Sequence, residues 1–298
     1  MNDDATCPLC SSSVNRQSDR RWRKDGFDIV QCHVCGLLYR FDLPTREELE
    51  AIYASDYFNS SDGTTNGQGY QDYVGDEPLH RLNARRRIDR LDALGGSRGD
   101  LLDVGAAAGF FVDEARRDGW AARGIDVAAA MTKVATERLG VDVATTTLAE
   151  APLEGGTFDA ITMWDYIEHA VDPCGDLARA TELLRPGGVV GLSTGDAASA
   201  VARGSGARWH LLTPRHHNFF FTRATLAHAL DQAGFDVISA SHPGAVYPLS
   251  YVVYKVQTIA RLRFLDRVAA SLRGTKLGER ALPLNLGDII TVWARRRP

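Results

Sequence analysis

The chain has 298 residues, of which 44% are hydrophobic and 24% charged, and its formal charge at pH 7 is −4. This length suffices for one α/β core with a small additional module, and the composition excludes a disordered or fibrous protein. A protein that binds a nucleic-acid backbone usually has a net basic face, so the charge argues against nucleic acid as a partner.

The first residues, 1–10, lack the positive and apolar regions of a secretory signal, which predicts a cytoplasmic protein. The most apolar late stretch, Val246 to Leu265, contains Lys255, Arg261 and Arg263, so no transmembrane segment is expected. Five cysteines, four of them in two pairs, suit a reducing compartment in which thiols bind metal.

Two Cys-x-x-Cys pairs form the first motif along the chain. Cys7 and Cys10 make one pair, Cys32 and Cys35 make the other, and 21 residues (positions 11 to 31) separate them. This spacing is typical of a tetrahedral zinc site built on two turns. Four thiolates leave no coordination position open for water, so residues 1–42 are predicted to form a structural zinc ribbon.

Basic side chains surround Trp22 between the two pairs, namely Arg16, Arg20, Arg21, Arg23 and Lys24. Such a cluster would suit RNA, although runs of charge are more often solvated faces, and both interpretations stay open. His33 lies between two better placed thiols and is predicted to be a surface residue.

Residues 43–77 are predicted to connect the ribbon to the main domain. A short helix with an apolar face of Leu49, Ile52 and Tyr53 is expected at its start. Asn59 to Gly69 is rich in Gly, Ser, Thr and Asn and is either a linker or a flap that closes over a site.

Alternating helix and strand signals open the main domain, residues 78–298. In chain order they are a helix at Pro78–Leu94, a strand at Asp100–Val104, a helix at Phe110–Arg117, a strand at Ala121–Asp126 and a helix at Ala128–Leu139. This alternation predicts a doubly wound, largely parallel sheet.

The turn after the first of these strands carries a candidate ligand site. Small residues from Gly105 to Gly109 let the backbone approach a ligand at a helix N-terminus. Asp126, 23 positions after Asp103, ends the next strand, where a carboxylate can accept both hydroxyls of a ribose. The Gly-x-Gly-x-x-Gly pattern that receives a pyrophosphate is absent, so a nucleoside other than a dinucleotide is favoured.

Asp103, Gly105, Ala107 and Gly109 resemble the first motif of class I S-adenosylmethionine-dependent methyltransferases, with alanine in place of the family's middle glycine. The resemblance continues through residues 157–169, which look like the family's fourth strand and following loop. It further includes the Leu-Arg-Pro-Gly-Gly run at 184–188 and a fifth strand at Val189–Ser193.

This resemblance covers Leu79 to Arg296 and implies a Rossmann-like seven-stranded sheet. The last two strands are expected at Phe235–Ala240 and Ile289–Arg295, the latter antiparallel. It also implies S-adenosylmethionine as the methyl donor. The residues assigned to cofactor binding are Asp103, Gly105, Ala106, Ala107, Gly109, Phe110, Asp126, Val127, Leu148, Trp164 and Asp165.

The acceptor is indicated by a looser resemblance. The cysteine pairs ahead of the core, Trp209 with His210, and the run Pro214 to Phe220 are similar to zinc-ribbon methyltransferases of carbohydrate and secondary-metabolite pathways. The Asn/Asp-Pro-Pro-aromatic run of nucleic-acid and glutamine amino-methylases is replaced by Trp164, Asp165 and Tyr166. A small hydroxylated or sugar-like acceptor is therefore expected, methylated on oxygen or carbon.

Loss of a proton from such an acceptor is helped by a base with a pKa near 7, which favours histidine. His169 and His217 are the predicted catalytic residues; His210 and His216 lie near His217 in the same predicted lid, 196–222, and His169 has a scaffold role as its alternative. The aromatic residues Trp209, Phe219, Phe220 and Phe221 either contact the acceptor or anchor the core. A second insertion, 241–287, is a lid, a dimer contact or a membrane-surface helix.

Three other functions stay open from the sequence. An rRNA or tRNA methyltransferase would use the ribbon and its arginines to hold the nucleic acid. A catalytically silent scaffold would bind the cofactor without transferring a methyl group. A nicotinamide enzyme is a weaker alternative, because fold alone does not fix function and the glycine pattern is missing.

Overall fold

The structure is a computed structural model that describes residues 3–45, 47–48, 73–95, 98–260, 267–268, 271–272 and 275–298. Residues 59–69, predicted to be a linker or flap, lie outside the described residues, as do Leu49, Ile52 and Tyr53 of the predicted short helix.

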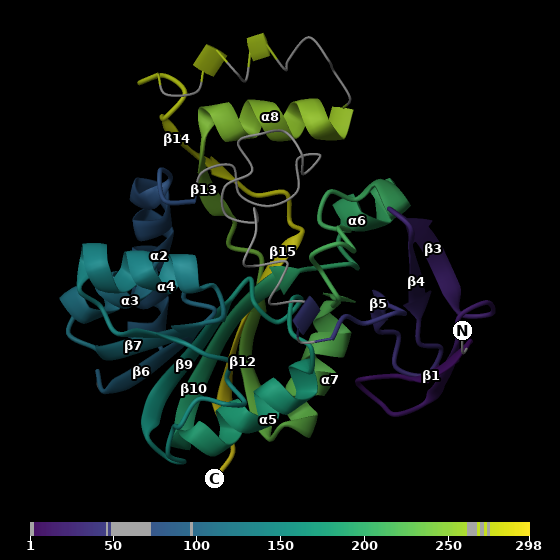
Figure 1. Cartoon of the computed structure of the whole chain (residues 1–298), viewed down its shortest axis with the longest axis horizontal. Helices are drawn as coiled ribbons and strands as arrows, with labels where there is room; N and C mark the ends of the chain where they lie inside the picture. Colours follow the sequence, from purple (N-terminus) through teal and green to yellow (C-terminus); the bar gives the residue numbers. More distant parts are fainter. Residues whose placement is uncertain are drawn as a thin grey trace.

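A seven-stranded sheet forms the centre of the main domain (Figure 1). Its strands are β6 (Asp100–Val104), β7 (Ala121–Asp126), β8 (Val143–Thr145), β9 (Phe158–Trp164), β10 (Leu184–Gly195), β12 (Phe235–Ser241) and β15 (Ile289–Arg296). They lie in the order β12-β15-β10-β9-β6-β7-β8, with β15 antiparallel to both neighbours and the other neighbouring pairs parallel. The predicted fold class is therefore confirmed.

Alternate side chains of the central strands enter two separate hydrophobic cores. Leu101 and Val189 pack with residues of α2 (Glu77–Asp92) and α3 (Phe110–Arg117). Leu102 and Val190 pack instead with residues of α5 (Pro173–Leu183) and α7 (Arg223–Gln232). Strands buried on both faces favour consecutive apolar residues, as at Leu101 and Leu102 of β6 and at Val189 and Val190 of β10.

Two predicted elements have a boundary that differs by more than two residues from the structure. The helix expected at Ala128–Leu139 is α4 (Ala129–Val134), which continues as one π-helical turn at Ala135–Leu139 and ends at Gly140 with φ of 66°. The strand expected at Val189 begins earlier, because Leu184 already pairs with Phe158 before a bulge.

The N-terminal module consists of short strands. β1 (Asp4–Thr6) pairs with β2 (Ser13–Asn15), while β3 (Arg20–Lys24), β4 (Phe27–Gln31) and β5 (Leu38–Arg40) form a second sheet. The fourth strand of this sheet is β11 (Phe219–Phe220), which comes from the predicted 196–222 insertion and lies antiparallel to β5. The ribbon and the insertion therefore form one structural unit.

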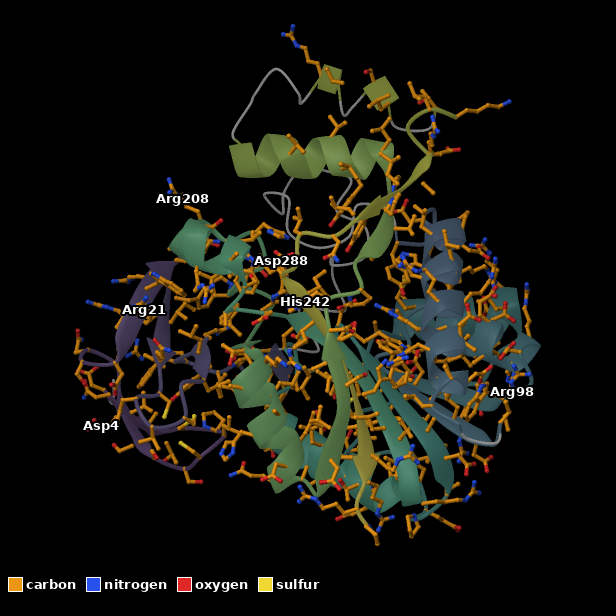
Figure 2. All side chains as sticks on the ribbon, turned by 180° about the vertical axis from the view of Figure 1, so that it is seen from behind. Asp4, Arg21, Arg98, Arg208, His242 and Asp288 are labelled. Atoms are coloured by element: carbon orange, nitrogen blue, oxygen red, sulfur yellow. The ribbon has the colours of Figure 1, made fainter. Side chains whose placement is uncertain are left out.

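Ion pairs neutralise much of the basic cluster on the ribbon. Arg16, Arg20 and Arg23 each place a guanidinium nitrogen within 4.0 Å of the buried Asp28 carboxylate. Arg21 stacks on the Trp22 ring and, in Figure 2, points away from the protein. Three of the five basic side chains are therefore paired with a carboxylate of the module.

The 196–222 insertion contains α6 (Ala200–Ser205), a 3-10 turn (Gly206–Arg208) and β11. The four aromatic residues whose role the sequence left open, Trp209, Phe219, Phe220 and Phe221, are all buried. They therefore anchor the core.

The 241–287 insertion contains β13 (Ala245–Pro248) paired with β14 (Ala281–Leu284), and α8 (Leu249–Ala260) between them (Figure 1). Asn83 of α2 donates to and accepts from the backbone of Val246, so its side chain fixes β13. Among the helices that the structure describes, none is long and apolar enough to cross a membrane.

A polar junction ties both insertions to the sheet, near the residues labelled His242 and Asp288 in Figure 2. His242 Nε2 lies 3.0 Å from Asp196 Oδ2, and the backbone N–H of Asp196 donates to the carbonyl oxygen of Asp288. The indole N–H of Trp209 donates to the Asp288 carboxylate at 3.0 Å. Each insertion is therefore anchored where β10 ends.

Candidate active site

A cavity of about 2120 Å³ lies at the carboxyl ends of β6, β7 and β9. Of the predicted site residues, it is lined by Asp103, Gly105, Ala106, Ala107, Phe110, Asp126, Val127, Leu148, Trp164, Asp165, His169 and His217. Gly109 is not among the lining residues. A Cβ atom added to Gly109 would lie 2.8 Å from Val141 and 2.9 Å from Ala135, so this glycine is needed for packing at the start of α3.

The turn after β6 and the end of β7 form one wall of the cavity. Asp126 accepts hydrogen bonds from the backbone N–H groups of Ala107 and Ala128, both at 2.8 Å and each to a different carboxylate oxygen. A carboxylate oxygen accepts more than one hydrogen bond, so both atoms can still receive a ligand hydroxyl. A Cβ atom on Gly105, at φ of 76°, would lie 2.9 Å from the Tyr166 ring. The bare backbone and the paired oxygens fit a ribose.

Asp103 lies beneath this turn and is buried. Thr162 donates a hydrogen bond to Asp103 Oδ1 at 2.6 Å, but burial has the larger effect and raises the pKa of Asp103 to about 7. A cationic ligand group beside this carboxyl would favour its ionised form. The site therefore suits a ligand with two hydroxyls and can also accommodate a positive charge beside Asp103.

We expect the substitution Ala107→Gly to raise the melting temperature. Ala107 has φ of 44°, in the left-handed region where a Cβ atom is strained, and its backbone bond to Asp126 does not depend on the side chain. The relief is about 0.5–1 kcal/mol. Thermal unfolding measures it, and the control Ala108→Gly, at a neighbouring position outside that region, is expected to lower the melting temperature. A lower melting temperature for Ala107→Gly would contradict the strain.

Asp165 stands at the end of β9 with φ of 51°, again left-handed. Ser193 Oγ donates to Asp165 Oδ1 at 2.8 Å, and the Asp165 backbone N–H donates to the Ser193 carbonyl oxygen at 3.0 Å. The Arg87 guanidinium lies over the Trp164 ring and 3.4 Å from Asp165 Oδ2. A strained residue held from several elements is typical of a functional position.

Three predicted cofactor residues contribute apolar walls. Leu148 is buried in the main core, and Trp164 packs edge-on against Trp293 with ring centroids 5.5 Å apart. Phe110 stacks on Tyr73 at 5.9 Å. A nucleobase or an acceptor ring can be enclosed by such surfaces.

His169 and His217 both line the cavity, with ring centroids 4.7 Å apart and perpendicular planes. His169 Nδ1 lies 2.9 Å from the carbonyl oxygen of His216, and His217 Nδ1 lies 2.9 Å from that of Leu211. Because a carbonyl only accepts, each Nδ1–H donates, so Nε2 is the acceptor nitrogen in the neutral form of each ring.

Burial lowers the pKa of His169 to about 4, below the value near 7 that the sequence suggested for a base. The imidazole is therefore uncharged throughout the neutral range, but at this pKa it is a weaker proton acceptor than the base of pKa near 7 that was expected. His216 is buried and its pKa is likewise lowered to about 4, mainly by burial. His210 lines the cavity and lies 3.6 Å from the Asp288 carboxylate.

Glu168 is buried beside these histidines, and burial raises the pKa of its carboxyl to about 8. Glu168, His169 and His217 each place one ligand atom within 4.8 Å of the others, a set that could hold a metal ion. With no metal ion bound, the three side chains thus offer proton acceptors and a largely protonated carboxyl at neutral pH.

We expect Glu168→Gln to gain stability relative to the unsubstituted protein as the pH rises. The native pKa of about 8 lies above the unfolded value of 4.5, so the native state holds a proton that the unfolded state has lost. The Glu168 protein therefore loses stability between pH 4.5 and 8, by about 1.4 kcal/mol per pKa unit, and the glutamine variant is spared this loss. Unfolding in urea from pH 5 to 9 measures the difference, with Glu182→Gln, an exposed site, as the control. A pH-independent difference would contradict the raised pKa.

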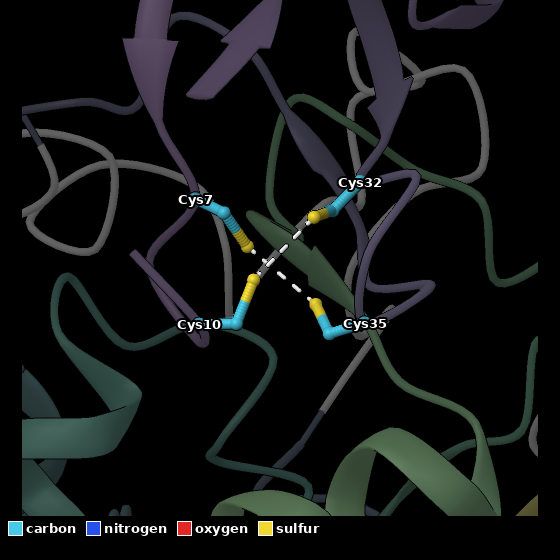
Figure 3. Close-up of side chains that lie close together, drawn as sticks. All are labelled: Cys7, Cys10, Cys32 and Cys35. Carbon is cyan, nitrogen blue, oxygen red and sulfur yellow. Dashed lines mark hydrogen bonds between the residues drawn. The ribbon is translucent and has the colours of Figure 1, made fainter. Parts of the chain in front are cut away.

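The cysteine cluster on the ribbon is a separate site (Figure 3). The sulfur atoms of Cys7 and Cys35 lie 3.6 Å apart and those of Cys10 and Cys32 3.5 Å apart, with all four within 4.8 Å of one another and none in a disulfide. A tetrahedral zinc with bonds of about 2.3 Å has sulfur separations of about 3.8 Å. The cluster is therefore compatible with a zinc ribbon. His33 does not belong to it and lies on the surface.

Comparison with known proteins identifies the family. The model of the family described as "Methyltransferase domain" matches residues 77–240, more than half of the chain, from α2 to the end of β12. The chain belongs to this methyltransferase-domain family. Its sheet order, with an antiparallel strand inserted next to the edge, is that of the class I fold.

Individual relatives agree with this assignment. A ubiquinone biosynthesis O-methyltransferase of Xanthomonas oryzae pv. oryzae is 35% identical over 127 residues, which cover 40% of this chain and 52% of the relative. The chain thus spans about half the length of the curated relatives it matches.

Two solved structures share the fold. An S-adenosylmethionine-dependent methyltransferase from Archaeoglobus fulgidus has 16% identity and a TM-score of 0.51, covering 75% of this chain and 99% of its own. A phosphoethanolamine N-methyltransferase 2 of Haemonchus contortus, in complex with S-adenosylmethionine, has 14% identity and a TM-score of 0.50, covering 88% and 62%. Identities this low show the fold alone.

Several residues that shape the cavity of this methyltransferase-domain protein were not identified from the sequence. Arg87 is one of many arginines on α2, and Ser193 is an ordinary strand residue, so no pattern marked either of them. Tyr247 and Tyr251 stack at 5.0 Å and line the cavity from β13 and α8. Their spacing of four residues was a sequence signal that could have identified this pair. It lay in the 241–287 insertion, whose role the sequence left open.

Proposed function

We propose that this protein transfers the methyl group of S-adenosylmethionine to a hydroxyl oxygen of a small, ring-shaped acceptor. The observation that carries the proposal is that one cavity is lined both by Asp126, whose oxygens suit a ribose, and by the paired imidazoles of His169 and His217.

The donor end of the cavity is supported by the fit of its residues. Asp126 would accept the ribose hydroxyls, the Gly105 backbone would lie against the nucleoside, and Leu148 would flank the adenine. When bound, S-adenosylmethionine supplies an electrophilic methyl group on a sulfonium. Asp103 would then lie near the positively charged end of the ligand.

At the acceptor end, the chain holds and deprotonates the hydroxyl. Methyl transfer from a sulfonium is an in-line displacement, so much of the rate comes from holding the oxygen and the methyl carbon in line. The acceptor O–H would donate to Nε2 of His169, which takes the proton as the new C–O bond forms. His217, perpendicular to His169, would orient the acceptor.

The class of acceptor follows from the walls of the cavity. Tyr247 and Tyr251 form a stacked pair, and Trp164 lies beside Asp165, so flat apolar surface adjoins polar groups. A hydroxylated aromatic ring or the face of a sugar matches both. The O-methyltransferases among the relatives support oxygen as the methylated atom.

The four cysteines are proposed to bind a structural zinc ion. Their sulfur separations and the lack of disulfides support it, and both suit the reducing cytoplasm, which is the proposed location.

The test is transfer of a labelled methyl group by the purified full-length chain to a panel of catechols, phenols, sugars and bulk tRNA. The expected result is label on a phenolic or sugar oxygen, identified by mass spectrometry of the product. Label on tRNA would contradict the proposal, and so would cofactor binding without transfer to any acceptor or cell extract.

A further inference from the structure

Asn218 lies where the ribbon, the 196–222 insertion and the loop after β9 meet, and it is 1% exposed. Its Nδ2 donates hydrogen bonds to the carbonyl oxygens of His169 at 3.0 Å and Ala170 at 3.1 Å. Its backbone N–H donates to the carbonyl oxygen of Glu168 at 2.8 Å. One residue therefore holds three consecutive carbonyl groups of the loop that carries the proposed base.

The ribbon holds Asn218 from the other side. The backbone N–H of Arg40 donates to the Asn218 carbonyl oxygen at 2.8 Å. The next two residues form β11, in which Phe219 pairs with Tyr39 and Phe220 with Leu38 of β5. Because β11 has only two residues, its position depends on β5.

The strand β5 in turn depends on the second cysteine pair. The backbone N–H of Cys32 donates to the Leu37 carbonyl oxygen at 2.9 Å, which closes the cysteine turn directly before β5. Cys32, Leu37 and Tyr39 are buried in one cluster that also contains Phe219 and Ile167. Contacts therefore run without interruption from the cysteine cluster, through β5 and Asn218, to His169.

We propose that Asn218 is a positioning residue that couples the cysteine cluster, proposed above to hold zinc, to the His169 imidazole. The ribbon then supports the reaction directly, by fixing the loop of the proposed base through the carbonyl groups of residues 168–170. The expected effect on rate rests on the proposed function, whereas the expected effect on the imidazole does not.

Disruption of Asn218 or of the cysteine cluster should displace the His169 imidazole without lowering the affinity for S-adenosylmethionine. Asp126 and the turn after β6 lie on other elements and make no hydrogen bond to Asn218 among the described residues. A displacement of the base by about 1 Å lowers a rate by about 100-fold, so the expected loss in kcat is of that order.

The experiment uses the full-length chain with ¹⁵N-labelled histidine, and His169→Gln assigns the His169 signals. Four samples are compared: the unsubstituted protein, Asn218→Ala, the unsubstituted protein after removal of its metal with a zinc chelator, and Thr181→Ala. Thr181 is a matched control because it too donates from a side chain to a backbone carbonyl, that of Ala233 at 2.6 Å. The imidazole ¹⁵N shifts, the affinity for S-adenosylhomocysteine and kcat are measured for each.

We expect Asn218→Ala and metal removal to shift the His169 ¹⁵N signals in the same direction and to lower kcat about 100-fold, with S-adenosylhomocysteine affinity within about twofold. Thr181→Ala should leave the His169 signals in place. If Asn218→Ala does not fold, Cys35→Ser carries the same expectation, because it opens the cysteine cluster and leaves the possible metal ligands Glu168, His169 and His217 in place. His169 signals unchanged by metal removal or by Asn218→Ala would overturn the inference, whereas shifted signals with no methyl transfer by the unsubstituted protein would overturn the proposed function only.

Discussion

His169→Gln is expected to lower kcat by about 100- to 10,000-fold while leaving the affinity for S-adenosylmethionine nearly unchanged. Glutamine keeps a donor for the His216 carbonyl but cannot take up the acceptor proton, and general base catalysis is worth about this factor. Steady-state kinetics and calorimetry on the same preparation give the two quantities. The control is His228→Gln, at an exposed histidine on α7, which should leave both kcat and the affinity unchanged.

The pH dependence of kcat/KM is a second test of His169 as the base. Because burial lowers the pKa of His169 to about 4, the base is neutral from pH 8 down to about pH 5, and kcat/KM should not fall near pH 6.5 on its account. A decline centred near 6.5 in the free enzyme, or a His169→Gln variant with full activity, would contradict His169 as the base.

Asp126→Ala is expected to weaken the binding of S-adenosylmethionine by about 100-fold or more, because a hydrogen bond to a charged group contributes about 1.5–3 kcal/mol and two ribose hydroxyls are involved. Ala107 and Ala128 also lose their acceptors, so a modest loss of stability accompanies it. Calorimetry measures the affinity and circular dichroism the fold. Asp236→Asn, exposed on β12, is the control. Unchanged affinity in a folded Asp126→Ala protein would contradict the ribose assignment.

Local signals in the sequence predicted the first two strands of the sheet, whereas β9, β10, β12 and β15 were expected from the family resemblance. The segments Asp100–Val104 and Ala121–Asp126 alternate with helices, and this alternation indicates parallel strands. The link between Asp126 and the turn at Ala107 was also predictable, since the carboxyl ends of adjacent parallel strands meet at one edge of the sheet.

Contacts that depend on tertiary structure could not be predicted in this way. Nothing local to Phe219 and Phe220 indicates that they pair with β5, which lies about 180 residues earlier in the sequence. The shifted pKa values of His169 and Glu168 could not be predicted either, because they are set by burial against residues distant in sequence. For the same reason Asn218 looked like one polar residue of a loop, although it joins the ribbon to the candidate site.

The central claim is tested most directly by titrating the purified chain with S-adenosylmethionine, S-adenosylhomocysteine and NAD in a calorimeter. The proposed function predicts saturable binding of both sulfur nucleosides, lost in Asp126→Ala, and no heat from NAD. Binding of NAD, or no binding of either sulfur nucleoside by the folded protein, would contradict it.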